Sequence, residues 1–236
     1  MKNLRIVFTG GSGRFGQVFR QFKSKYIIYF PTEKELNILN VASIEKYINK
    51  KKPKILIHAA ALSRPMEIHQ KKIDKSINLN IIGTANITKI CLKHNIKLIY
   101  FSTSYVYPGI RGNYKETDSL LPINYYAWSK LGGECSVKMY KNSLILRICM
   151  TEKPFIHKKA FFDLKTNFIF HDEVAKILPK LLFKKGIINL GGPTQSVFNF
   201  AKKYNKKIKK ISARKKFGKN TPLNPSMNLG KLNKII

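Results

Sequence analysis

Residues 9–19 of the chain read TGGSGRFGQVF, and this stretch decides the fold. Gly10, Gly13 and Gly16 form the spacing GxxGxxG between the apolar run LRIVF and a stretch of helical character. Glycines at a first strand-to-helix junction allow a tight turn and let the backbone come close to a pyrophosphate. Free N–H groups and the dipole of the following helix favour that anion. A purely structural turn would need one of these glycines, so the stretch predicts a dinucleotide-binding βα unit.

Apolar runs and helical stretches alternate outward from this loop. The alternation predicts an α/β fold, a Rossmann-type doubly wound parallel sheet with helices on both faces. The expected strands cover residues 4–10, 26–30, 54–61, 96–104 and 143–149, and the expected helices cover residues 14–25, 43–50 with Ser43 as the cap, 73–94 and 125–141.

After Met150 the pattern becomes shorter. Residues 151–168 have no strong periodicity, and a helix, a strand and a second helix are expected at 172–183, 187–192 and 197–204. Pro179 is expected to kink or end the first of these helices. We therefore divide the chain into an NAD(P)-binding Rossmann domain, residues 1–150, and a small C-terminal substrate-side region, residues 151–236. We expect the second region to be docked on the sheet rather than independent.

Composition bounds the class of protein. The chain has 236 residues, of which 44% are hydrophobic, enough for a substantial core. No apolar stretch approaches the ~20 residues of a membrane span, and the N-terminus reads as a strand rather than a signal peptide. The chain has three cysteines, an odd number, and none of them is in CxxC spacing: Cys91, Cys135 and Cys149. The histidines also lack the spacing of metal ligands. These features argue against a disulfide framework and a metal site, and they favour the reducing cytoplasm.

The formal net charge of +33 has two interpretations. One is an electrostatic surface for nucleic acid or another polyanion. The other is compositional bias, because the excess is mostly lysine, is spread along the chain and accompanies abundant Ile and Asn. The densest basic run, residues 202–219, contains no nucleic-acid-binding motif. We favour compositional bias and expect no nucleic-acid partner.

A second chemical motif lies in NYYAWSKLGGE, residues 124–134. Tyr126 and Lys130 are four residues apart, which places both side chains on one face of a helix. A tyrosine has a pKa near 10, and a cation one turn away stabilises its phenolate. We expect Lys130 to lower the pKa of Tyr126 towards 7. Tyr125 lacks this spacing and remains the alternative acid or a packing residue.

The end of the second strand bears on the choice of cofactor. An acidic residue there would bind the ribose 2′-hydroxyl of NAD. The sequence YFPTEKEL has no acid at the strand tip, and Glu33 comes late. Arg14 and Lys34 are cations that could receive a 2′-phosphate. This favours NADP(H), with NAD(H) as the alternative.

Taken together, several motifs resemble a known family. TGGSGRFG, HAAA at 58–61, NIIGT at 80–84, FSTSYVY at 101–107 and YAWSK at 126–130 resemble an extended short-chain dehydrogenase/reductase. STSYVYPG and GNYKETDSLLPINYYAWSKLGGE resemble the dTDP-4-dehydrorhamnose reductases and related NAD(P)-dependent nucleotide-sugar epimerases. The likeness is strong over residues 1–149 and patchy after them, where the stretch that follows Met150 is shorter than is usual in the family.

The resemblance implies a role for individual residues. The implied catalytic residues are Thr103, Tyr126 and Lys130. The implied cofactor-binding residues are Gly10, Ser12, Gly13, Arg14, Phe15, Gly16, Asn37, Ile38, Ala59, Ala60, Ala61, Asn80, Tyr126 and Lys130. Asn37 stands where the family usually has an acid beside the adenine.

The function implied by the resemblance is the reduction of a nucleotide-linked 4-keto sugar. Hydride would come from the nicotinamide, and Tyr126 would be the proton donor. Two alternatives stay open: a nucleotide-sugar epimerase of the same fold, and a non-catalytic NADP-binding regulatory subunit. The expected partner is a small-molecule nucleotide sugar without a membrane partner, and a homodimer is the family expectation.

Overall fold

A parallel sheet forms the centre of the molecule. The computed structural model describes residues 4–236. Six strands lie in the order β10-β5-β4-β3-β1-β2, and all neighbouring pairs are parallel. The chain moves outward from β1 to β2 on one side and continues with β3 on the other, so the strand order reverses beside β1. The strands are β1 (Arg5–Thr9), β2 (Ile27–Tyr29), β3 (Ile55–His58), β4 (Lys97–Thr103), β5 (Ser143–Ile148) and β10 (Gly186–Leu190).

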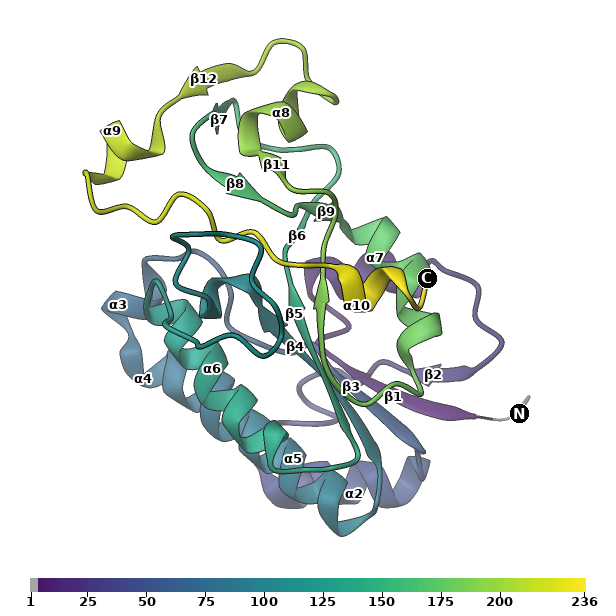
Figure 1. The fold of residues 1–236 in the computed structure, drawn as a ribbon. Coiled ribbons are helices and arrows are strands. Elements are labelled where there is room, and N and C mark those ends of the chain that lie inside the picture. Colours follow the sequence, from purple (N-terminus) through teal and green to yellow (C-terminus); the bar gives the residue numbers. More distant parts are fainter. Residues whose placement is uncertain (1–3) are drawn as a thin grey trace.

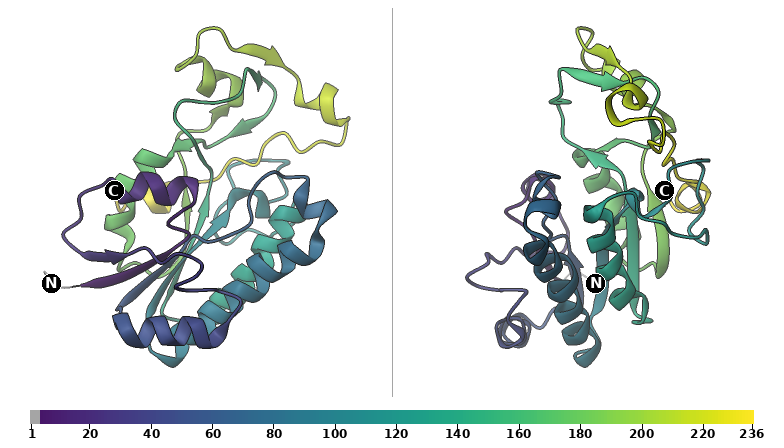
Figure 2. Two further views of the ribbon diagram at one scale, coloured as in Figure 1. Left: turned by 180° about the vertical axis from the view of Figure 1, so that it is seen from behind. Right: turned by 90° about the vertical axis from the view of Figure 1, so that its left-hand side faces the viewer.

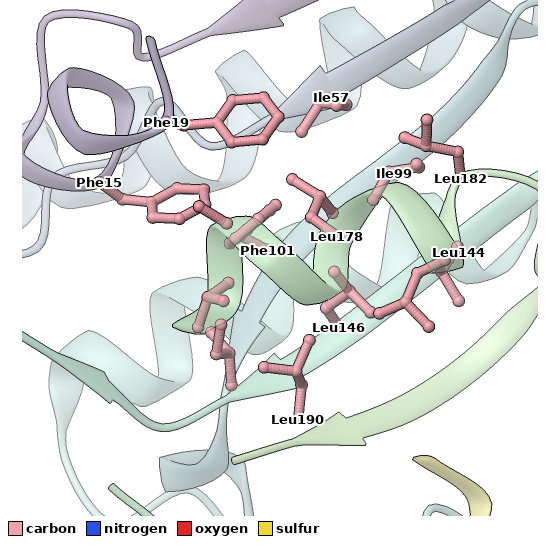
Figure 3. Close-up of a cluster of buried hydrophobic side chains, with 14 of the residues drawn as sticks. Phe15, Phe19, Ile57, Ile99, Phe101, Leu144, Leu146, Leu178, Leu182 and Leu190 are labelled. Carbon is pink, nitrogen blue, oxygen red and sulfur yellow. The ribbon is translucent and has the colours of Figure 1, made fainter. Parts of the chain in front are cut away.

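Helices cover both faces of this sheet (Figures 1 and 2). Buried side chains of α2 (Val41–Lys51), α5 (Gly83–Lys93) and α6 (Tyr125–Lys138) form one core with the sheet. Buried side chains of α1 (Arg14–Arg20) and α7 (His171–Leu181) form the core on the other face. Figure 3 shows Phe15 and Phe19 of α1 and Leu178 of α7 directed at the side chains of the strands. This arrangement confirms the Rossmann-type doubly wound sheet.

Several helices differ from the sequence prediction. Helix α1, expected over residues 14–25, ends at Arg20. The helix expected over residues 73–94 is observed as one run over residues 73–93, but its middle is a π-helix, η1 (Ile77–Ile82), between α4 (Ile73–Ser76) and α5. Helix α2 begins at Val41, and Asn40 rather than Ser43 is its N-cap. The Asn40 side chain accepts a hydrogen bond from the Ser43 N–H at 3.0 Å. The prediction of Ser43 as the cap was wrong because asparagine caps as well as serine and stands one helical turn earlier.

The chain after residue 150 builds a small lobe and also returns to the sheet. Helix α7 and strand β10 belong to the central core, whereas the lobe stands beyond the carboxyl ends of the strands (Figure 1). The lobe has its own aromatic core, which includes Phe155, Phe170 and Phe200. The division at residue 150 stays a prediction. The remaining strands are β6 (Met150–Thr151), β7 (Lys159–Phe161), β8 (Lys165–Thr166), β9 (Ile169–Phe170), β11 (Gln195–Ser196) and β12 (Lys209–Ile211).

Short helices complete the chain. They are α3 (Ile68–Lys71), the 3₁₀ turn η2 (Ser104–Val106), α8 (Val197–Lys202), α9 (Ala213–Phe217) and α10 (Gly230–Asn233). Within residues 4–236, every helix is too short or too polar to cross a bilayer.

Candidate active site

The glycine loop joins β1 to α1 at the point where the strand order reverses. Gly10 has a φ of +81°, and a Cβ there would lie 2.6 Å from the backbone nitrogen of Ala60. A Cβ on Gly16 would lie 2.6 Å from the Cα of Gly11. Both positions therefore require glycine, one for its backbone conformation and the other for close packing. In open α/β sheets, ligands bind beside this switch point at the carboxyl ends of the strands.

The first turn of α1 is open to a ligand. Gly13 is its N-cap, and no side chain of the described chain caps this end. The first N–H groups of a helix lack partners within the helix, and the helix dipole favours an anion there. Arg14, the first residue of α1, adds a positive charge. The loop therefore has the backbone and the charge to bind phosphate groups.

One cavity connects this loop to the C-terminal lobe. Its volume is about 1020 Å³. Its walls include the glycine loop, the ends of β3, β4 and β5, helix α6, and lobe residues around Phe155, Phe161 and Phe168. The predicted site residues that line it are Gly10, Gly13, Arg14, Phe15, Gly16, Ala59, Ala61, Thr103, Tyr126 and Lys130. The short region after Met150 thus contributes walls to a cavity large enough for a sizeable ligand.

Five other predicted cofactor residues lie outside the cavity lining. Ser12 is exposed in the glycine loop, Ala60 lies behind Gly10, and Ile38 is buried in the core under α5. The side-chain oxygen of Asn37 accepts the Leu39 N–H at 2.9 Å. The amide of Asn80, on η1, bonds the N–H and C=O of Leu62 and the Ser129 hydroxyl. Asn80 therefore holds the loop after β3 in place.

Tyr126 lies on α6 within the cavity wall. Burial raises the pKa of Tyr126 to about 12, against the opposing effects of a hydrogen bond with the Thr103 side chain and the charges of Arg64 and Arg14. The tyrosine therefore holds its proton at neutral pH. Its pKa is not lowered towards 7 in this structure, contrary to our expectation, because desolvation outweighs the nearby positive charges. Thr103, at the end of β4, is buried.

Lys130 is almost completely buried one turn further along α6. Burial lowers the pKa of Lys130 to about 7, although the nearby Glu134 carboxylate opposes this shift. Its Nζ lies 4.2 Å from the centre of the Tyr100 ring. A lysine with such a pKa changes charge within the physiological range, which is characteristic of functional sites.

A buried polar network fixes the far side of α6. Glu134 forms an ion pair with Arg147 of β5, with 2.6 Å between Oε1 and Nη2, and accepts the Ser102 hydroxyl at 2.6 Å. Arg147 also donates to the Tyr107 hydroxyl at 2.9 Å, and Tyr107 donates to Asn189 of β10 at 2.7 Å. The network joins α6 to three strands and so positions the helix that carries Tyr126 and Lys130.

Sequence reasoning missed two charged residues in the cavity wall. Arg64, in the loop after β3, and Arg14 both form ion pairs with Glu152, at 2.9 Å and 3.2 Å. Partial burial disfavours the charged form of Glu152, but Arg64 and Arg14 outweigh this and lower its pKa. The two missed residues, Arg64 and Glu152, belong to no motif, and only the fold brings them together. Within residues 4–236, no group of three potential ligands could hold a metal ion.

Comparisons with known proteins identify sequences similar to this chain. The family model described as "RmlD substrate binding domain" matches residues 4–152. A dTDP-4-dehydrorhamnose reductase from Aggregatibacter actinomycetemcomitans is 27% identical over 202 residues, which are 81% of this chain and 63% of that protein. A methionine adenosyltransferase 2 subunit beta from Xenopus laevis is 30% identical over 154 residues, 61% of this chain and 46% of that protein.

Solved structures show the same fold. The crystal structure of a dTDP-4-dehydrorhamnose reductase from Bacillus anthracis, in complex with NADP, superposes with a TM-score of 0.88 and 23% identity. The superposition covers 99% of this chain and 94% of the crystallised chain. The chain thus matches 63% and 46% of the length of the two curated relatives, although it covers nearly all of the crystallised one.

Proposed function

Because the chain belongs to the RmlD substrate binding domain family, we propose that it is an NAD(P)-dependent reductase of a nucleotide-linked 4-keto sugar. One observation carries the proposal: Thr103, Tyr126 and Lys130 line the same cavity as the glycine loop. A phosphate-binding loop and a set of proton-transfer residues are thus open to a common ligand. The likeness to a dTDP-4-dehydrorhamnose reductase supports the choice of reaction.

The residues of the loop fit a dinucleotide. Gly10 and Gly16 permit the tight turn of the loop, because a Cβ at either position would collide with neighbouring backbone, and the uncapped start of α1 offers N–H donors. Arg14 and Phe15 would hold the phosphates, whereas the N–H of Gly13 donates to the carbonyl of Gly10 at 3.0 Å and shapes the loop. Arg14 and the exposed Lys34 favour NADP(H), while NAD(H) remains the alternative cofactor.

The nicotinamide, when bound, supplies the hydride for the keto carbon. Tyr126 donates the proton to the oxygen of that carbon, and its high pKa keeps this proton in place until charge develops there. Thr103 donates a hydrogen bond to the same oxygen. With the cofactor bound, Lys130 would bind a ribose hydroxyl and, as an ammonium, would stabilise the phenolate that Tyr126 becomes.

Oxidation of NADPH by a dTDP-linked 4-keto-6-deoxy sugar tests this proposal. We expect Tyr126→Phe to lower kcat by about 10²–10⁴-fold, the usual contribution of general acid catalysis. Tyr125→Phe is the matched control, because Tyr125 is adjacent but 54% exposed, and it should keep the wild-type rate. Equal rates for Tyr126→Phe and the wild type would rule out Tyr126 as the proton donor.

A non-catalytic NADP-binding subunit is the second candidate. It is supported by the similarity to a protein named as a subunit, methionine adenosyltransferase 2 subunit beta. A nucleotide-sugar epimerase is the third, and it would retain its cofactor without net NADPH consumption. NADPH binding without turnover of 4-keto or epimerisable nucleotide sugars would favour the subunit. A homodimer and a cytoplasmic location remain part of the proposal, the latter supported by three cysteines that are all free thiols.

A further inference from the structure

Three charged side chains meet at the wall of the cavity from separate parts of the chain. Arg14 begins α1, Arg64 lies in the loop after β3, and Glu152 follows β6. The Glu152 carboxylate pairs with both guanidinium groups. Its Oε2 accepts a hydrogen bond from Arg64 at 2.9 Å, and its Oε1 lies 3.2 Å from Nη1 of Arg14 in an ion pair. Arg14 also donates to the Ser63 hydroxyl at 3.3 Å. One carboxylate therefore bridges the glycine loop and the loop after β3.

The two arginines of this cluster can still bind an additional anion. Two guanidinium groups and one carboxylate leave a net charge of +1. The arginine side chains are 44% and 39% exposed, whereas Glu152 is 20% exposed, so the arginines still present donors to the cavity. Guanidinium forks bind phosphate oxygens in pairs. The acidic side chains that line the cavity are Glu152 and Glu67, and Glu67 is highly exposed and paired with Lys71.

We propose that Glu152 is a resident carboxylate that competes with the phosphates of a nucleotide ligand for Arg14 and Arg64. Arg64 is thus a phosphate-binding residue, and Glu152 sets how tightly the pair binds. The inference rests on the proposed function, because it assumes that a dinucleotide enters at the glycine loop. A carboxylate a few ångströms from a phosphate repels it, and its removal should tighten binding about fivefold.

Calorimetric titration of NADPH into the ligand-free protein tests the proposal without any turnover. We expect Glu152→Gln to lower the Kd about fivefold. Arg64→Gln should raise the Kd about tenfold, because it removes a charge-assisted hydrogen bond. Glu45→Gln is the matched control, since Glu45 also pairs with cations, Lys93 and His94, but does not line the cavity. Its Kd should equal that of the wild type, and thermal melting verifies that each variant is folded.

The outcomes separate this inference from the proposed function. If the wild type binds NADPH and Glu152→Gln binds it equally or more weakly, Glu152 merely orients the arginines and the inference is overturned, while dinucleotide binding stands. If the wild type binds neither NADPH nor NADH, the proposed function fails. Inorganic pyrophosphate then decides the inference alone: tighter binding by Glu152→Gln than by wild type and Glu45→Gln supports it, and any other result overturns it.

Discussion

At the scale of single residues, a buried cation shows how desolvation acts on this lysine-rich chain. Lys97 begins β4 and is 7% exposed, and its Nζ has no hydrogen-bond partner within residues 4–236. Burial, together with the charge of Lys185, lowers the pKa of Lys97 to about 8 from an ordinary 10.5. Below pH 8 the folded protein therefore carries a buried ammonium on Lys97, which is solvated less well than the same group in the unfolded chain.

We predict that Lys97→Met stabilises the protein by about 2 kcal/mol at pH 7, which raises Tm by about 4–8 °C. The unfolded chain binds more protons than the folded chain between pH 8 and 10.5, so the stability of the wild type rises across that window. The gain in unfolding free energy of the variant over the wild type should be complete below pH 8 and disappear by about pH 10.5. Calorimetric melting across this range measures it. Lys54→Met, an exposed change of the same charge, is the control, and a constant advantage at all pH values would contradict the explanation.

The sequence predicted the site residues that belong to local motifs, but it did not predict those that only the fold brings into contact. Gly10, Tyr126 and Lys130 could be singled out because their spacing is local, and the structure places all three around the cavity. The contact between Arg64 and Glu152 joins positions 88 residues apart, and neither position has a local signature. The pKa of Tyr126 was also mispredicted, because burial, which spacing does not report, outweighs charge.

At the scale of elements, the ion pair between Glu134 and Arg147 connects α6 to β5. Both side chains are about 97% buried, and the pair is supported by Ser102 and Tyr107. Removal of one partner from a buried pair leaves an uncompensated charge. We predict that Arg147→Met lowers the free energy of unfolding by about 3–5 kcal/mol. Urea denaturation gives this value.

The double variant Arg147→Met with Glu134→Leu provides the control. It removes both charges and should recover more than half of the unfolding free energy that Arg147→Met loses, because a well-packed apolar pair can replace a buried ion pair. A double variant that is less stable than Arg147→Met would show that the hydrogen bonds, and not the unpaired charge, dominate.

The strands of the sheet were predicted, and so was helix α8 of the lobe, expected at residues 197–204, whereas the short strands of the lobe were not. Strands such as β4 and β5 are continuous apolar runs because both faces of a parallel sheet are covered. The lobe strands have two or three residues, too few for any periodicity. Their pairing is also distant: β7 pairs with β12, and β8 with β11, so the order of residues 151–168 depends on contacts with later residues.

At the scale of the whole molecule, the dominant feature is charge. The chain has 45 basic and 12 acidic residues. The ion pairs in the described residues are mostly exposed at one partner or both, and such pairs contribute little. Mutual repulsion among the cations therefore outweighs local attraction and opposes the compact state.

We predict that added salt stabilises the protein. Raising the ionic strength from about 0.01 M to about 0.15 M shortens the Debye length from about 30 Å to about 8 Å, which screens repulsion between distant lysines but little within contact pairs. We expect a gain of about 1–2 kcal/mol, or about 2–8 °C in Tm by scanning calorimetry at pH 7. NaCl and KCl should act equally, because the effect is screening rather than binding of one cation. A Tm that falls with salt would mean that attractive pairs dominate, and the high charge would then need a functional partner to explain it.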